Sequence, residues 1–189
     1  MTLRFDTDKG AAPSQGTAAG NSHGNPHSAE AAIDLDRFAD IRPYHDEEVA
    51  AVLARLAHDS ELLDAITRYR LPRLSRFAPP LARKLASFRI QREVRNVSTV
   101  RDFQLRIADY MAHMISSTTH GFEVKGLDRL SPDQAYLFIG NHRDIALDPA
   151  FVNYALYTAG HDTVRIAIGD NLLQKPFVTD LMRLNKSFI

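Results

Sequence analysis

A histidine with two nearby aspartates is the feature of this chain best suited to chemistry. His142 follows a short apolar run, Tyr136–Ile139, and Asp144 and Asp148 come two and six residues after the histidine. Neutral imidazole can accept a proton from a hydroxyl group near pH 7, and a carboxylate on its other ring nitrogen would stabilise the imidazolium ion. The segment therefore indicates a general base held where a strand gives way to a helix.

Either aspartate can be the partner of His142 in this pattern. Six positions along a continuous helix correspond to ~600° of rotation, so His142 and Asp148 would not share a helix face. Asp148 can reach the imidazole only if residues 142–147 form a loop or a bulged helix start. Asp148-Pro149 favours this, because it is typical of an N-cap followed by proline in the first turn. A purely structural interpretation, with His142 in a loop and Asp148 only a cap, stays open.

The segment from Asn141 to Pro149 resembles the first motif of the glycerol-phosphate and lysophosphatidate acyltransferase family. The family places a histidine, four residues and an aspartate after a short apolar strand, whereas five residues separate His142 from Asp148 here. Either a one-residue bulge restores the contact or Asp144 takes the role. Asp148 matches the family better, because Asp-Pro-Ala leads into an apolar helix.

The resemblance continues downstream of this motif. Ala167–Leu173 is similar to the second strand and loop of the family, and Asn185–Ile189 is similar to the opening of its second motif, which normally continues to an arginine. The chain stops partway through this pattern. The resemblance therefore predicts that the arginine and the family's Pro-Glu-Gly element lie beyond Ile189.

The resemblance implies acyl transfer without an acyl-enzyme, a cofactor or a metal. His142, oriented by Asp148 or Asp144, would deprotonate a hydroxyl of glycerol 3-phosphate or lysophosphatidate in phospholipid synthesis. The oxygen would then attack the thioester of acyl-CoA or acyl carrier protein. Arg143 and Asn141 would contact the substrate, and Arg143 is suited to pairing with a phosphate.

Composition and periodicity divide the chain into three parts. Residues 1–40 are expected to be a disordered tail, because Gly10–Ser28 has too few apolar residues to offset its ordering entropy. Residues 41–120 are expected to be helical with a basic surface, and residues 121–189 to be the N-terminal part of an acyltransferase α/β domain. The expected fold class is α/β: a helical region followed by an incomplete layer of mostly parallel strands.

Apolar residues at helical spacing predict several helices in the region 41–120. One is expected to start near Asp46, and three others are expected at Glu61–Tyr69, Leu81–Phe88 and Thr99–Thr118. Pro72 and Pro79-Pro80 interrupt the pattern and predict loops or breaks. Thr99 and Asp102 are spaced as in a capping box. The apolar face expected for the last helix comprises Phe103, Ile107, Tyr110, Met111 and Met114.

After Gly121 the pattern becomes an alternation of strands and helices. Strands are expected at Phe122–Leu127, Tyr136–Ile139 and Thr163–Ile168, helices at Pro149–Tyr157 and Phe177–Leu184, and the start of a strand at Ser187–Ile189. Ser131-Pro132-Asp133 predicts a turn. Strands and helices that alternate in this way favour parallel pairing.

A basic stretch runs from Arg70 to Arg101, where nine Lys or Arg residues accompany one acid, Glu93. Leucines and phenylalanines are interleaved with them. This combination indicates docking on an anionic membrane surface, with a location in the cytoplasm at the inner face of the cell membrane. The alternatives are a solvated helical face with its leucines packed inward, and nucleic-acid binding, for which no reader motif is present.

Composition and motifs limit the other classes of function that the chain could have. The chain has no cysteine, which excludes disulfides and thiolate metal sites, and its 23 basic and 23 acidic residues balance. A metal site of His142 and Asp144 with His113 or His161 lacks a typical ligand spacing. A hydrolase is disfavoured, because no Gly-x-Ser-x-Gly element occurs. The main alternative to an enzyme is a non-catalytic membrane- or protein-binding module. Oligomeric state has no signature in the sequence.

Overall fold

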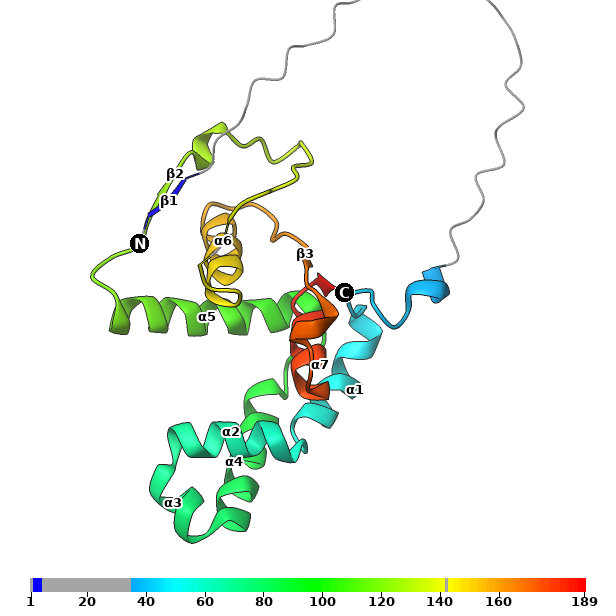
Figure 1. Cartoon of the computed structure of the whole chain (residues 1–189), viewed down its shortest axis with the longest axis vertical. Coiled ribbons are helices and arrows are strands. Elements are labelled where there is room, and N and C mark those ends of the chain that lie inside the picture. Colours follow the sequence, from blue (N-terminus) through cyan, green and yellow to red (C-terminus); the bar gives the residue numbers. More distant parts are fainter. Residues whose placement is uncertain (1, 5–34, 142) are drawn as a thin grey trace, which may run out of the picture.

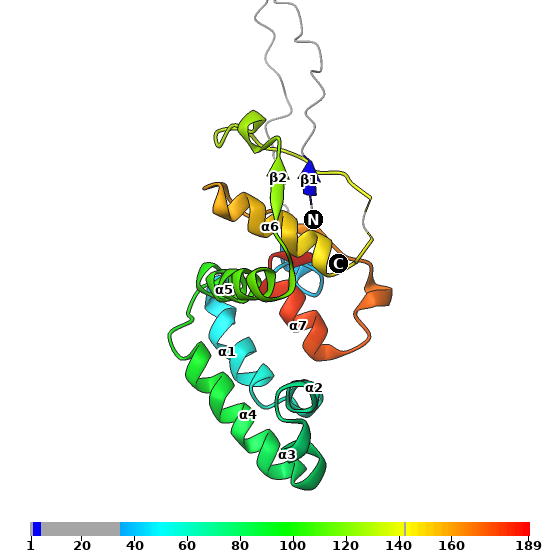
Figure 2. The same ribbon diagram turned by 90° about the vertical axis from the view of Figure 1, so that its left-hand side faces the viewer.

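The computed structural model describes residues 2–4, 35–141 and 143–189. Its helices α2, α3 and α4 lie together at one end of the molecule, β1 and β2 lie at the other end, and α5 and α6 lie between them (Figure 1 and Figure 2). The α-helices are α1 (Asp46–Leu56), α2 (Ser60–Arg70), α3 (Pro72–Phe77), α4 (Pro79–Val94), α5 (Val100–Thr118), α6 (Leu147–Thr158) and α7 (Pro176–Leu184). The strands are β1 (Thr2–Arg4), β2 (Glu123–Lys125), β3 (Ile166–Ala167) and β4 (Ser187–Phe188), and short 3-10 turns cover Leu35–Phe38, Leu127–Arg129 and Asp170–Leu172.

The strands form two short parallel pairs. β1 pairs with β2, with Leu3 opposite Val124, and β3 pairs with β4, with Ile166 opposite Ser187. The structure confirms the predicted fold class, a helical region followed by an incomplete α/β layer with parallel strands. The strand β1 was not predicted. The segment Gly10–Ser28, predicted to be disordered, lies outside the described residues.

The first long helices follow the predicted pattern. In α1 the apolar positions at helical spacing, Val49, Val52 and Leu53, are buried. α5 begins at the predicted capping box: Thr99 Oγ1 accepts a hydrogen bond from the Asp102 amide, and the Asp102 carboxylate accepts one from the Thr99 amide. One member of the predicted face is wrong, because Tyr110 is 52% exposed.

The prolines lie where one helix ends and the next begins. Pro72 is the first residue of α3, and Pro79-Pro80 opens α4. Proline is tolerated in a first turn because the amide it lacks would have no partner there. The predicted breaks are confirmed, because Leu71 and Ala78 lie between helices, whereas α4 is longer than the predicted Leu81–Phe88.

One hydrophobic core joins the helical region to the C-terminal segment. Its buried residues are Val49, Val52, Leu53, Leu56, Val97, Val100, Phe103 and Leu184. Leu184, on α7, is fully buried among residues of α1 and α5. The Ile189 amide also donates to the Ile41 carbonyl at 3.0 Å. Burial of these side chains makes the association of the two parts favourable.

A second core lies under α6. Ala155 and Leu156 are buried there with Leu130, and Tyr136 and Phe138 pack against them. The predicted strand Tyr136–Ile139 is not formed. Its alternation is present, since Leu137 and Ile139 are 85% and 88% exposed. No strand pairs with this segment within the described part of the chain, and a strand requires ladder hydrogen bonds to a neighbour.

The other predicted elements of the C-terminal part are confirmed with altered ends. β2 lies inside the predicted Phe122–Leu127, and β3 occupies two residues of the predicted Thr163–Ile168. α6 and α7 coincide with the two predicted helices to within two residues, and β4 lies in Ser187–Ile189. The Gln134 amide donates to the Ser131 carbonyl in the predicted turn.

Candidate active site

Helix α6 begins earlier than the sequence predicted: its N-cap is Ala146, and the carboxylate of Asp144 binds the backbone at this start. Oδ1 of Asp144 accepts hydrogen bonds from the amides of Ala146 and Leu147, at 2.9 and 2.8 Å. These amides belong to the first turn of the helix, where backbone donors have no intrahelical acceptor. The prediction that Asp148 is the N-cap and Pro149 the first helical residue was therefore wrong, because α6 already includes Leu147 and Asp148.

The carboxylate of Asp148 turns back toward the preceding loop. Its Oδ2 accepts hydrogen bonds from the amide of Arg143 at 2.7 Å and from the amide of Asp144 at 3.1 Å. The Asp148 amide also donates to the Asp144 carbonyl at 3.3 Å. Residues 143–147 thus form a closed turn held by the carboxylates of Asp144 and Asp148. A turn at the helix start is the kind of geometry that we expected to be necessary if Asp148 is to approach residue 142.

The predicted substrate contacts lie at this turn. Asn141 and Arg143 have exposed side chains, and Asp144 and Asp148 are partly exposed. His142, the predicted general base, lies outside the described residues. The structure therefore brings Asp144, Asp148 and the Arg143 backbone together.

The C-terminal end of α6 is fixed as firmly as its start. The Gly160 amide donates to the Tyr157 carbonyl at 3.0 Å, and the His161 amide donates to the Leu156 carbonyl at 2.9 Å. Gly160 has φ = 83°, the left-handed conformation that favours glycine in this helix ending. α6 is therefore a defined helix from its aspartate turn to Gly160, packed between α5 and the second core.

Two polar features of this region were missed from the sequence. One is Asn153, a buried amide in the middle of α6. Its signal is an asparagine inside the apolar run Phe151–Leu156. The other is Asp180 on α7, which accepts hydrogen bonds from Arg55 and Tyr44, more than a hundred residues away in the chain. Nothing local in the sequence marks that pairing.

The described residues contain no group of three His, Asp or Glu side chains placed to hold a metal ion. Among the helices that the structure describes, none is long and apolar enough to cross a membrane.

Comparison with known proteins supplies one match. The searches against curated proteins and against solved structures found no match for this chain. A protein-family model described as Acyltransferase matches residues 121–189, a little over a third of the chain. The matched segment contains β2, α6 and α7 and the turn closed by Asp144 and Asp148. Residues 121–189 are therefore similar to the acyltransferase family, in agreement with the resemblance noted at Asn141–Pro149, and they pack against a helical region that the family model does not cover.

Proposed function

We propose that this protein transfers an acyl group from a thioester, acyl-CoA or acyl carrier protein, to a hydroxyl of glycerol 3-phosphate or lysophosphatidate. His142 is the general base in this proposal, and Asp148 orients it. Two observations support the proposal: the family match of residues 121–189 and the position of the Asp148 carboxylate, which lies 2.7 Å from the amide that follows His142 in the chain.

Asp148 is the preferred partner because its carboxylate binds the backbone amide that follows His142. Oδ2 holds the amides of Arg143 and Asp144, whereas Oδ1 has no hydrogen-bond donor within the described residues. Oδ1 of Asp144 is occupied by two amides of α6. A carboxylate that accepts hydrogen bonds from the neighbouring backbone amides is well placed to accept one from an imidazole N–H. This hydrogen bond would fix the tautomer and stabilise the imidazolium ion.

The proposed reaction has one nucleophilic addition and one departure. The imidazole of His142 takes the hydroxyl proton as the oxygen forms a bond to the thioester carbonyl carbon. The carbon–sulfur bond then breaks, and the thiolate recovers the proton from the imidazolium ion. General-base assistance of this kind is worth ~10²–10⁴-fold. The exposed guanidinium of Arg143 is suited to a phosphate of either substrate.

Substitutions that keep the turn test this assignment. Asp148→Asn retains an oxygen for the amides of Arg143 and Asp144 but removes the charge, so acyl transfer should fall by ~10²-fold or more while the fold is kept. Acyl transfer by His142→Ala should fall at least as far. Asp144→Asn is the matched control, because asparagine caps helices as well as aspartate does. Activity should be measured with glycerol 3-phosphate and lysophosphatidate as alternative acceptors.

Near-normal activity in Asp148→Asn, together with loss in Asp144→Asn, would transfer the orienting role to Asp144. Activity that survives His142→Ala would end the general-base proposal. An absence of acyl transfer with every acceptor and thioester, in a protein that is folded, would favour the alternative of a non-catalytic binding module.

We also propose that the end of the molecule formed by α3 and α4 docks on an anionic membrane. α4 turns its small residues inward, since Ala82 and Ala86 are buried, and its large ones outward. The exposed fractions are 57% for Leu81 and 62% for Phe88, and Phe77 on α3 is 81% exposed. A helical face that packs through alanines and exposes leucine and phenylalanine is unlike a face whose leucines pack inward.

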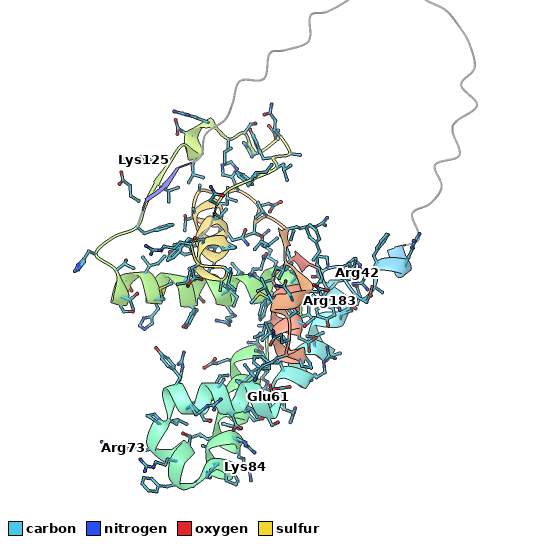
Figure 3. The ribbon with its side chains drawn as sticks, viewed as in Figure 1. Arg42, Glu61, Arg73, Lys84, Lys125 and Arg183 are labelled. Atoms are coloured by element: carbon cyan, nitrogen blue, oxygen red, sulfur yellow. The ribbon has the colours of Figure 1, made fainter. Side chains whose placement is uncertain are left out.

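Basic side chains surround these apolar ones. Arg73 and Lys84 lie at the same end of the molecule, far from Lys125 (Figure 3). Arg89 and Arg92 on α4 and Arg95, which follows the helix as its C-cap, are exposed. Each basic residue near an anionic leaflet contributes about 1 kcal/mol of attraction, which salt weakens. A cytoplasmic protein held at the inner face of the cell membrane would meet its lipid substrates there.

Liposome binding tests the docking proposal. Vesicles with anionic lipid should bind the protein. Neutral vesicles should bind it weakly, and 0.5 M salt, which makes the screening length roughly twofold shorter than at 0.15 M, should weaken binding strongly. The double variant Phe77→Ser with Phe88→Ser should reduce vesicle binding. The double variant Arg73→Gln with Lys84→Gln should reduce both vesicle binding and the salt dependence of that binding. Matched controls are Tyr110→Ser, an exposed aromatic of α5, and Arg106→Gln with Lys125→Gln, which remove the same charge elsewhere. Equal effects in variants and controls would contradict a localised docking surface.

A further inference from the structure

A pocket of about 410 Å³ lies between α5 and α6. Ala150, Asn153, Tyr154 and Tyr157 line it from α6. At 100° per residue these positions lie about 140–240° around the helix from Asp148. The pocket is therefore across α6 from the aspartate turn, and it is separate from the candidate active site.

Asn153, which lines this pocket, has a buried hydrogen-bond donor without a partner among the described residues. The side chain is 7% exposed, and its Oδ1 accepts a hydrogen bond from the Val164 amide at 2.9 Å, which fixes the orientation of the carboxamide. Nδ2 has no partner among the described residues. A buried amide donor without an acceptor is destabilising, so this group favours a ligand with an acceptor atom.

Two cations add to this donor. Lys186 is half-buried, and its Nζ donates only to the neutral Thr163 Oγ1, at 3.0 Å, among the described residues. Its backbone is held in the left-handed region, φ = 61°, which is uncommon for lysine and persists only where the surroundings determine it. Arg101 at the rim has no ion pair with any described residue. One acid, Asp162, is also at the rim, exposed to solvent.

The remaining wall is mixed: Gln104, His161, Thr163 and Asn185 are polar, and an apolar side faces them. Leu105, Ile107, Ala108 and Met111 line the pocket from α5, and the rings of Tyr154 and Tyr157 line it from α6. The volume lies within the usual range of small-molecule sites. The donor of Asn153 that has no partner among the described residues and the cation of Lys186 together favour an anionic acceptor as the head group.

We propose that this pocket binds a small amphiphile with a carboxylate head and a short apolar tail. The carboxylate accepts from Nδ2 of Asn153 and pairs with Lys186, and the tail lies against Met111 and the two tyrosines. Such a ligand would supply the acceptor that Asn153 lacks and neutralise a half-buried cation.

Calorimetric titration of the full chain with octanoate, 1-octanol and octylamine tests the proposal. Octanoate should bind more tightly than octanol, and octylamine should not bind. Asn153→Asp keeps an acceptor for the Val164 amide but replaces the donor with a negative charge, so it should weaken octanoate binding by ~10-fold or more. Lys186→Met should also weaken octanoate binding by ~10-fold. Arg89→Met, which removes one exposed cation from α4, is the control and should change binding less than about twofold.

Equal affinity for octanoate, octanol and octylamine, or no octanoate binding to the unaltered chain, would overturn the proposal. Circular dichroism establishes whether Asn153→Asp is folded; if it is not, Lys186→Met decides the outcome, and unchanged binding there would overturn the proposal too. Asp148→Asn should bind octanoate like the unaltered chain. A failure of the acyl-transfer proposal therefore leaves this test unaffected.

Discussion

The carboxylate of Asp180 on α7 accepts two hydrogen bonds from the guanidinium of Arg55 on α1, with both nitrogen–oxygen distances at 2.8 Å. Tyr44 donates a third hydrogen bond to the same carboxylate, at 2.6 Å. The Asp180 side chain is only 10% exposed. This cluster connects the helical region to the segment 121–189 beside their shared core.

Asp180→Asn should therefore destabilise the protein by about 1–3 kcal/mol, because it leaves the guanidinium of Arg55 without its charged, bidentate partner. Chemical denaturation measures the change, and a double-mutant cycle with Arg55→Met isolates the pair. The exposed ion pair of Lys175 and Glu61, at 2.9 Å, is a matched control. Lys175→Met should change the free energy of unfolding by no more than about 1 kcal/mol.

The same carboxylate predicts a loss of stability in acid. Burial by itself raises the pKa of Asp180, but the hydrogen bonds from Arg55 and Tyr44 outweigh it, and the pKa lies below its ordinary value of 3.8. A lowered pKa in the folded state stabilises the protein above the unfolded-state pKa, and this stabilisation disappears as the pH falls through the folded-state value. The difference in unfolding free energy between the unaltered chain and Asp180→Asn should be constant near neutral pH and shrink below pH 3.8. A difference that does not depend on pH would contradict this assignment.

Thr99→Ala should lower stability by about 1 kcal/mol, because the amide of Asp102 loses its side-chain acceptor in the first turn of α5. Thermal unfolding measures the effect. Ser116→Ala, near the other end of α5, is the comparison: its hydroxyl donates to a carbonyl of the same helix and leaves no helix end uncapped. Equal destabilisation of the two variants would mean that the capping box contributes nothing of its own.

Ala82→Leu should destabilise the packing of α4 on α2 by about 1–3 kcal/mol, because Ala82 is fully buried and a larger side chain overfills the contact. Leu81→Ala, at the adjacent but 57% exposed position, should change stability little while it weakens vesicle binding. Denaturation and liposome co-sedimentation, done on both variants, separate the inward face of α4 from the outward one. A large loss of stability in Leu81→Ala would place its side chain in the core.

The sequence predicted the elements whose signals are local. The periodic apolar residues of α1 and the capping box at Thr99 lie within one or two turns, so they can be read without the fold. Tyr136–Ile139 has the alternation of a strand, yet it lacks a neighbour, and pairing is a property of the whole sheet. The parallel partner of β2 is Thr2–Arg4, about 120 residues away, which no local pattern indicates.

In the candidate site, too, the local features were predicted and the features that depend on the fold were not. The types and spacing of Asp144 and Asp148 identified the segment, but their separate roles depend on backbone geometry: Asp144 binds the amides of Ala146 and Leu147, and Asp148 closes the turn. The sequence predicted Asp148 as the N-cap, because Asp-Pro resembles a helix start. Asn153 was missed because its importance comes from the missing acceptor for its Nδ2, and only the packing of the folded chain reveals that a donor is buried without an acceptor among the described residues.

The burial of Leu184 under α1 and α5 has a practical consequence for dissecting this protein. A shortened chain that began at residue 121 would leave that leucine and the ring of Phe177 uncovered, and Asp180 would lose both of its donors. Such a piece should aggregate or stay unfolded, however well it retains the motif. Enzymology on this chain therefore has to keep the preceding helices, even though the family comparison alone would have discarded them.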